Sequence, residues 1–184
     1  KKVWDKNYGG DRDDIGEAIV ETEDNTFVIA ASTYSYGVGG DVLLLKINSD
    51  GELLWTKNFG GNKQDQLRDI DGNTMSGSHL TKTPDGGLLV SGYTSSYDGK
   101  PSDPFCELEP CMTGGNMWVF KIDTFGNLLW QYVHPGGGVA YSARQLNDGS
   151  VVIFGTTGPS IYGTPNPVES FPSYSQDLVV IKIR

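Results

Sequence analysis

The sequence predicts an all-β protein built from about three copies of one four-stranded antiparallel unit. Two stretches, residues 46–55 and 121–130, are near copies of each other, and each runs from Lys-Ile to Leu-Leu-Trp. The two halves of this motif recur at the chain ends, in residues 182–184 and 3–4. Glycine is abundant, at 25 of 184 residues, and the apolar residues come in short runs. This composition is typical of an all-β protein with many turns.

Each unit is aligned by one register aspartate: Asp24, Asp85 and Asp148. Asn25, Gly86 or Gly149 follows it, and these residues tolerate the positive φ of a tight hairpin turn. A first strand precedes the aspartate, as at residues 17–22. Apolar second strands follow it, at 27–30, 88–90 and 151–154. Third strands are predicted at 41–46, 116–121 and 177–182, and the fourth strand is led by tryptophan, as at 53–61.

Four antiparallel strands in a unit of about 50 residues are the composition of a propeller blade. We therefore predict one β-propeller-type domain over 1–184, with units at about 11–61, 62–137 and 138–184. Residues 1–10 match the fourth strand of a unit, but the first three strands of that unit do not precede them. The third unit, in contrast, ends after its third strand. We expect residues 1–10 to complete the last blade, or the chain to form part of a larger propeller or a homo-oligomer, because propellers typically have about four to eight blades.

Extra length is confined to particular connections. The spacing from register aspartate to third-strand lysine is 22 residues in the first unit, 36 in the second and 34 in the third. The added residues lie around 95–115 and 158–176, and a further insertion around 61–77 is predicted between a fourth strand and the next first strand. In an antiparallel blade both classes of connection leave the same face, which makes that face the candidate binding surface.

The inserted segments carry aromatic, acidic and amide side chains that suit a sugar ring, with its apolar C–H patches and hydroxyls. The candidate ligand-binding residues are Tyr97, Asp98, Asp103, Phe105, Tyr162, Phe171 and Tyr174. The alternative is that these aromatic residues pack on one another as small satellite cores.

The two cysteines, Cys106 and Cys111, lie together in the insertion of the second unit. They suggest a disulfide, and hence an oxidising compartment. A two-cysteine metal site is the alternative, but no histidine is nearby.

Acidic residues crowd the connections that follow the fourth strands, at 11–14 and at 65–71. Carboxylates on a loop suit calcium, and Asp69 and Asp71 resemble the middle of an EF-hand loop. Leu67 and Ser78 stand where that loop needs its first and twelfth ligands, so the EF-hand pattern fails. We expect no cofactor, with calcium at Asp69 and Asp71 as the alternative to aspartates that cap turns or face water.

The sequence gives little support for an enzyme. His79 and His134 fall in predicted strands without a nucleophile arrangement, although a pair of carboxylates for glycoside hydrolysis remains open among 23 acids. The recurring tryptophans read as packing residues. The recurring lysines Lys46, Lys121 and Lys182 are expected to lay their stems along the blade and reach a carboxylate or solvent.

The net charge of −9 and pI of about 4.5 argue against a nucleic-acid partner and against adhesion to an anionic membrane. No apolar run approaches the ~20 residues that span a bilayer.

The combined motif resembles a family of propeller-like repeats. It reads Trp-x-Lys-Asn-[Tyr/Phe]-Gly-Gly at 4–10 and 55–61, Asp-Gly-Gly and Gly-x-Thr at 85–94, and Lys-Ile-[Asp/Asn]-x-x-Gly-x-Leu-Leu-Trp at 46–55 and 121–130. Such repeats are common in large secreted and surface proteins of Bacteroidota and related bacteria. The resemblance implies an extracellular propeller, and it provides no catalytic residue that could be carried over to this chain. The third unit departs from it at residues 133–137.

These observations together predict a non-catalytic extracellular scaffold that presents its insertion loops to a protein or glycan partner. A carbohydrate-active enzyme, or an accessory domain of one, is the first alternative. The second is a structural spacer of a large surface protein.

Overall fold

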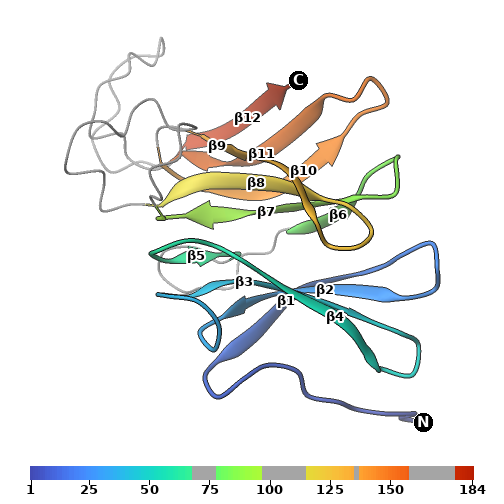
Figure 1. Cartoon of the computed structure of the whole chain (residues 1–184). Helices are drawn as coiled ribbons and strands as arrows, with labels where there is room; N and C mark the ends of the chain where they lie inside the picture. Colours follow the sequence, from blue (N-terminus) through green and yellow to red (C-terminus); the bar gives the residue numbers. More distant parts are fainter. Residues whose placement is uncertain (68–77, 97–114, 135–136, 158–176) are drawn as a thin grey trace, which may run out of the picture.

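Three antiparallel sheets, stacked in chain order, make up the computed structural model of the chain (Figure 1). The structure describes residues 1–67, 78–96, 115–134, 137–157 and 177–184. These residues contain no helix, so the predicted all-β class is confirmed, and none of them forms a helix long and apolar enough to cross a membrane. They form no closed barrel and no closed propeller, and the first and third sheets lie on opposite sides of the second (Figure 1).

Each sheet corresponds to one predicted unit. The first sheet, in the order β1-β2-β3-β4, contains β1 (Asp14–Glu21), β2 (Phe27–Thr33), β3 (Asp41–Ile47) and β4 (Leu53–Phe59). The second contains β5 (Asp65–Gln66), β6 (Leu80–Lys82), β7 (Leu88–Thr94), β8 (Asn116–Ile122) and β9 (Leu128–Val133); β5 and β6 both pair with β7. The third, in the order β10-β11-β12, contains β10 (Val139–Gln145), β11 (Val151–Thr157) and β12 (Asp177–Ile183).

The register aspartates stand in the turns between first and second strands, as predicted. The residue after each one has positive φ: 56° at Asn25, 84° at Gly86 and 82° at Gly149. Glycine adopts positive φ without a steric clash and asparagine adopts it with little strain, which is why these residue types recur at this position.

Every sheet has two faces, which we name by the chain direction. The forward face points toward the next sheet, and the backward face points toward the preceding one. The forward face of the first sheet and the backward face of the second enclose one apolar core, in which Leu44 and Phe120 are fully buried. The forward face of the second sheet and the backward face of the third enclose another, around Val119 and Ile153. Because side chains alternate along a strand, each sheet of the stack can serve two cores at once.

The first strand of each unit carries an irregularity at the same register. One extra residue interrupts the ladder between β1 and β2 at Glu17, and another interrupts that between β10 and β11 at Tyr141. In the second unit the chain leaves the ladder after Gln66, the last residue of β5, and returns at His79, whose carbonyl oxygen accepts a hydrogen bond from Ser91 N.

The insertion around 61–77 was therefore predicted in the wrong place. It interrupts the first strand, between β5 and β6, and does not precede it. A bulge already leaves one residue outside the ladder, so the chain can depart there without losing the pairs on either side.

The prediction that residues 1–10 complete the last blade of their own chain is wrong, because in the part of the chain that the structure describes the third sheet contains only β10, β11 and β12. Residues 1–13 form no strand and lie against the first sheet, where Trp4 Nε1 donates to Ser49 O at 3.0 Å and Tyr8 Oη to Gly51 O at 2.6 Å. The N-terminus and β12 lie at opposite ends of the stack (Figure 1). In an open stack, the two ends of one chain are separated by all of its sheets.

Candidate functional site

The candidate site residues from the sequence lie outside the described residues. Tyr97, Asp98, Asp103 and Phe105, together with Cys106 and Cys111, fall in 97–114, and Tyr162, Phe171 and Tyr174 fall in 158–176. Asp69 and Asp71 fall in 68–77. Their contacts, the disulfide and the calcium site therefore stay predictions. The structure gives the framework to which those segments are attached.

The β2–β3, β7–β8 and β11–β12 connections all leave one end of the stack, which we call the loop end. The turns between first and second strands and between third and fourth strands occupy the other end, the turn end. This separation follows from the antiparallel pairing within each sheet. The strand ends that flank 97–114 and 158–176, the two segments with the seven candidate ligand-binding residues, are therefore on the loop end.

One aspartate anchors the loop end of the first sheet. Asp14 accepts hydrogen bonds from Thr33 Oγ1, from Ser35 Oγ at 2.7 Å and from the Gly10 amide at 2.8 Å. Burial by itself raises the pKa of Asp14, but the bonds from Thr33, Gly10 and Ser35 outweigh it, and the net pKa is lowered. Asp14 therefore fastens the chain that enters β1 to the chain that leaves β2.

An equivalent aspartate anchors the second sheet. Asp65 is fully buried and accepts from Thr94 Oγ1, Ser96 Oγ and, at 2.7 Å, the Gly61 amide. The backbone repeats as well, since Ser95 N donates to Gln64 O at 2.8 Å just as Tyr34 N donates to Asp13 O at 2.9 Å.

Sequence reasoning missed these anchors because it grouped their aspartates with candidate calcium ligands. The signal was present as Gly-Gly-x-x-x-Asp at 9–14 and 60–65, together with Thr-x-Ser at 33–35 and 94–96. In the third unit Gly138, next to the Val139–Thr156 pair, stands at the aspartate position and brings no carboxylate.

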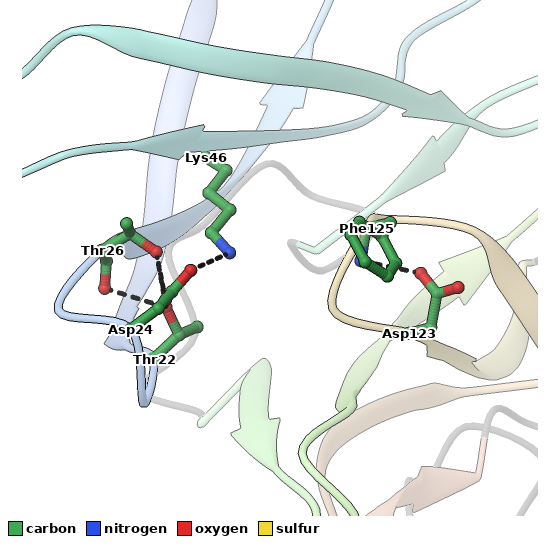
Figure 2. A network of polar contacts seen from close by, with 6 residues as sticks. All are labelled: Thr22, Asp24, Thr26, Lys46, Asp123 and Phe125. Atoms are coloured by element: carbon green, nitrogen blue, oxygen red, sulfur yellow. Dashed lines mark hydrogen bonds and ion pairs between the residues drawn. The ribbon is translucent and has the colours of Figure 1, made fainter.

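Repeated ion pairs hold the turn end. Lys46 Nζ lies 2.8 Å from Asp24 Oδ2, and Lys121 Nζ lies 2.5 Å from Asp85 Oδ2. Figure 2 shows Asp24 between the Lys46 ammonium and the hydroxyls of Thr22 and Thr26. The hydrogen bond from Lys46 is the main cause that lowers the pKa of Asp24.

Asp85 repeats this arrangement, because the hydrogen bonds from Lys121 and then Thr83 lower its pKa to about 2. In the third unit Lys182 Nζ lies 3.4 Å from Asp148 Oδ2. The prediction that these lysines reach a carboxylate is confirmed.

A groove of about 530 Å³ lies at the turn end, where the three first strands approach one another. Its lining includes Glu23, Lys82 and Arg144, whose charged groups face solvent, and the apolar Val20 and Leu80. Thr81 Oγ1 donates to Ala143 O at 2.6 Å and ties two of these strands together. The volume suits a small polar ligand, but the groove was not predicted from the sequence.

Neither histidine lines this groove. His79 is 1% exposed, with its Nδ1 2.9 Å from Ser91 O. His134 is half-buried beside Tyr132, and burial lowers its pKa. Both side chains therefore act within the packing of the second sheet.

Within the described ranges, no group of three His, Cys, Asp or Glu side chains is arranged to hold a metal ion. The chain matches no protein-family model and no curated protein. The resemblance to the bacterial propeller-like repeats therefore stays a prediction.

Proposed function

We propose that the chain is a non-catalytic, extracellular binding scaffold whose loop end contacts a protein or glycan partner. One observation carries the proposal: the two longest connections, which hold every candidate aromatic residue, join strands that end on the same side of a stacked sheet framework. Binding residues are commonly found on loops held by a rigid scaffold.

The anchors at Asp14 and Asp65 support this assignment. Asp65 fixes the start of the 95–115 connection, because its carboxylate accepts hydrogen bonds from Thr94 Oγ1 and Ser96 Oγ at the end of β7. Asp14 does the same for the short connection of the first unit, and Gly138 leaves the third unit without such a carboxylate. Fixed starting points reduce the conformational entropy that is lost when a loop binds its partner.

A carbohydrate-active enzyme remains the first alternative, and it needs a general acid with a raised pKa. Every described aspartate whose pKa shift is resolved has a lowered pKa, and Asp14, Asp24 and Asp85 are held by hydrogen bonds. These five carboxyls suit anchoring better than proton donation. The spacer alternative needs no site at all.

Loop grafts test the proposal, because the chain provides its own matched replacements. In the first variant, the seven-residue connection 34–40 replaces 95–115 of the second unit. In the control, the turn 123–127 replaces the equally long turn 48–52 at the other end. Both variants are expected to melt cooperatively near the wild-type temperature.

The binding assay uses a printed array of defined oligosaccharides and an array of purified extracellular matrix proteins. The wild type and the turn control are expected to retain a common probe, and the loop graft is expected to lose it. Retention by the loop graft would place binding elsewhere. If the wild type retained nothing on either array, the spacer alternative would be favoured.

A further inference from the structure

The third sheet exposes a face that is covered in the other two. Leu44 on the forward face of the first sheet and Val119 on that of the second are both 0% exposed. The equivalent residue of the third sheet, Val180, is 60% exposed, and the neighbouring Leu178 is 70% exposed. Phe154, directly opposite Val180 on β11, adds a third apolar side chain to the exposed face.

The same difference is seen in the repeated lysines. The side chains of Lys46 and Lys121 are 9% and 5% exposed, whereas that of Lys182 is 56% exposed. Lys121 is covered by the following sheet, whose Gln145 accepts a hydrogen bond from it at 2.9 Å. The third sheet thus has the forward face of an internal sheet, but no sheet covers it.

The third sheet also lacks one strand. β4 and β9 pair with β3 and β8, but among the described residues β12 pairs with β11 alone. An exposed strand edge with unpaired backbone groups is a template for another strand.

The N-terminal segment already stands where the fourth strand of a preceding unit would lie. Trp4 and Lys6 lie over Gly51 as Trp55 and Lys57 lie over Gly126. The correspondence continues along the segment, because Tyr8 packs on the backward-face residues of the first sheet. Its counterpart Phe59 packs in the same way on Phe120 of the second, with ring centroids 4.8 Å apart. The segment thus occupies the place of a fourth strand, although no described strand pairs with it.

The chain therefore carries two parts of one unit at opposite ends of its stack (Figure 1). We propose that a second copy of the chain joins them. β12 of one copy pairs with residues 3–10 of the other, and the forward face of its third sheet covers the backward face of the other's first sheet. The N-terminal segment keeps its contacts with its own first sheet.

Two such contacts, related by a two-fold axis, would join two copies of three sheets into a closed ring of six. Six lies within the range of about four to eight blades that propellers use. A contact of this head-to-tail kind closes into a ring when the rotation from one sheet to the next allows it. In the closed ring, both the exposed forward face of the third sheet and the free edge of β12 are covered. The second copy is favoured over an unrelated partner because the segment that fits the edge belongs to this chain.

The register of the new pair follows from that of β3 and β4. Leu44 lies opposite Lys57 and Lys46 opposite Trp55. Val180 of one copy is therefore expected opposite Lys6 of the other, and Lys182 opposite Trp4.

The first test is the mass of the chain in solution, by sedimentation velocity over a hundredfold range of concentration. The expected species is twice the 19.9 kDa of one chain. Val180→Asp is expected to give a monomer with an unchanged circular dichroism spectrum, because Val180 makes no core contact within one copy. The matched control Leu129→Asp, at a residue 54% exposed on β9, is expected to stay dimeric. A wild-type monomer at every concentration would overturn the proposal.

The second test is cross-linking in a chain that carries Cys106→Ser and Cys111→Ser. A Lys6→Cys chain mixed with a Val180→Cys chain is expected to give a covalent dimer with a short bis-maleimide. Replacing Val180→Cys by Leu129→Cys should abolish the product. A chain that carries Lys6→Cys and Val180→Cys together discriminates between the two modes of closure: dimer mass supports the proposal, and a cross-link at monomer mass would overturn it.

Discussion

Replacing Asp85 tests whether the stability that a repeated lysine–aspartate pair contributes depends on burial of its lysine by the following sheet. Asp85→Asn removes the charge that pairs with Lys121, whose side chain is 5% exposed. Breaking a buried pair costs about 3–5 kcal/mol. Two features reduce this value: the Asp85 side chain is 58% exposed, and Lys121 keeps Gln145 as an acceptor. We expect a loss of about 1–2 kcal/mol in the free energy of unfolding, after discounting for solvent screening.

The assay is urea unfolding followed by tryptophan fluorescence, with thermal melting as a second readout. For a chain of this size, the expected loss corresponds to a fall of about 2–8 °C in Tm. Asp148→Asn is the matched control, because its partner Lys182 is exposed, and we expect no change beyond experimental error. Adding Lys121→Met to Asp85→Asn removes the unpaired ammonium and should recover part of the stability. Equal effects of Asp85→Asn and Asp148→Asn would refute the reasoning.

Three further predictions concern pH, the loop-end anchor and the bulge register. The pKa of Asp85 is lowered from 3.8 to about 2 in the folded chain, so the stability that its carboxylate contributes is complete above pH 3.8 and is lost as the pH falls toward 2. Wild type and Asp85→Asn should therefore become equally stable at about pH 2, and a constant difference in stability between pH 5 and 2 would contradict this. Asp65→Ala leaves the buried Thr94 hydroxyl and the partly buried Gly61 amide without their acceptor, and the expected cost in urea unfolding is about 2–3 kcal/mol. Asp14→Ala, at the less buried counterpart, is expected to cost less, and the reverse order would contradict the assignment. Gly92→Ala is expected to destabilise the second sheet by about 1–3 kcal/mol, because a Cβ there would clash with the carbonyl oxygen of Gln66. An unchanged Tm would contradict this expectation, because it would show that the β5–β7 pairing shifts to make room for the methyl group.

Most of the sheet framework could be predicted because it is repeated. Asp24, Asp85 and Asp148 align three units, and a pattern that recurs at one register identifies strands and turns more reliably than local propensity does. The third strands were found to within one residue, since their apolar runs end at the recurring lysines.

The position of the insertion at 68–77 could not be predicted in the same way. Sequence spacing counts the added residues, but it does not reveal that Glu17 and Tyr141 are bulges at which a strand can be interrupted. The place of residues 1–10 was also open, because a fourth-strand motif fits equally beside β12 or in front of the first sheet. The hydrogen bonds of Trp4 and Tyr8 show that within one chain the segment lies against the first sheet.

The candidate site was less predictable than the framework. The aromatic and acidic composition of a long connection indicates binding. The arrangement of these residues depends on contacts that differ from one unit to the next, so the repeat does not help to predict it. The anchors at Asp14 and Asp65 were visible as a motif, although their role was not, because a carboxylate that accepts three hydrogen bonds and one that binds calcium look alike in sequence.

The most direct test of the stacked arrangement compares three distances between equivalent turn residues, Glu23, Pro84 and Asn147. Each pair of positions is changed to cysteine in the Cys106→Ser/Cys111→Ser background and spin-labelled, and the labelled chain is diluted into unlabelled chain before pulsed electron resonance. The 23–84 and 84–147 distances are expected to be similar and the 23–147 distance clearly longer, because β6 of the second sheet contacts both β1 and β10 and stands between them. Three equal distances would show a ring closed within one chain and would contradict the open stack.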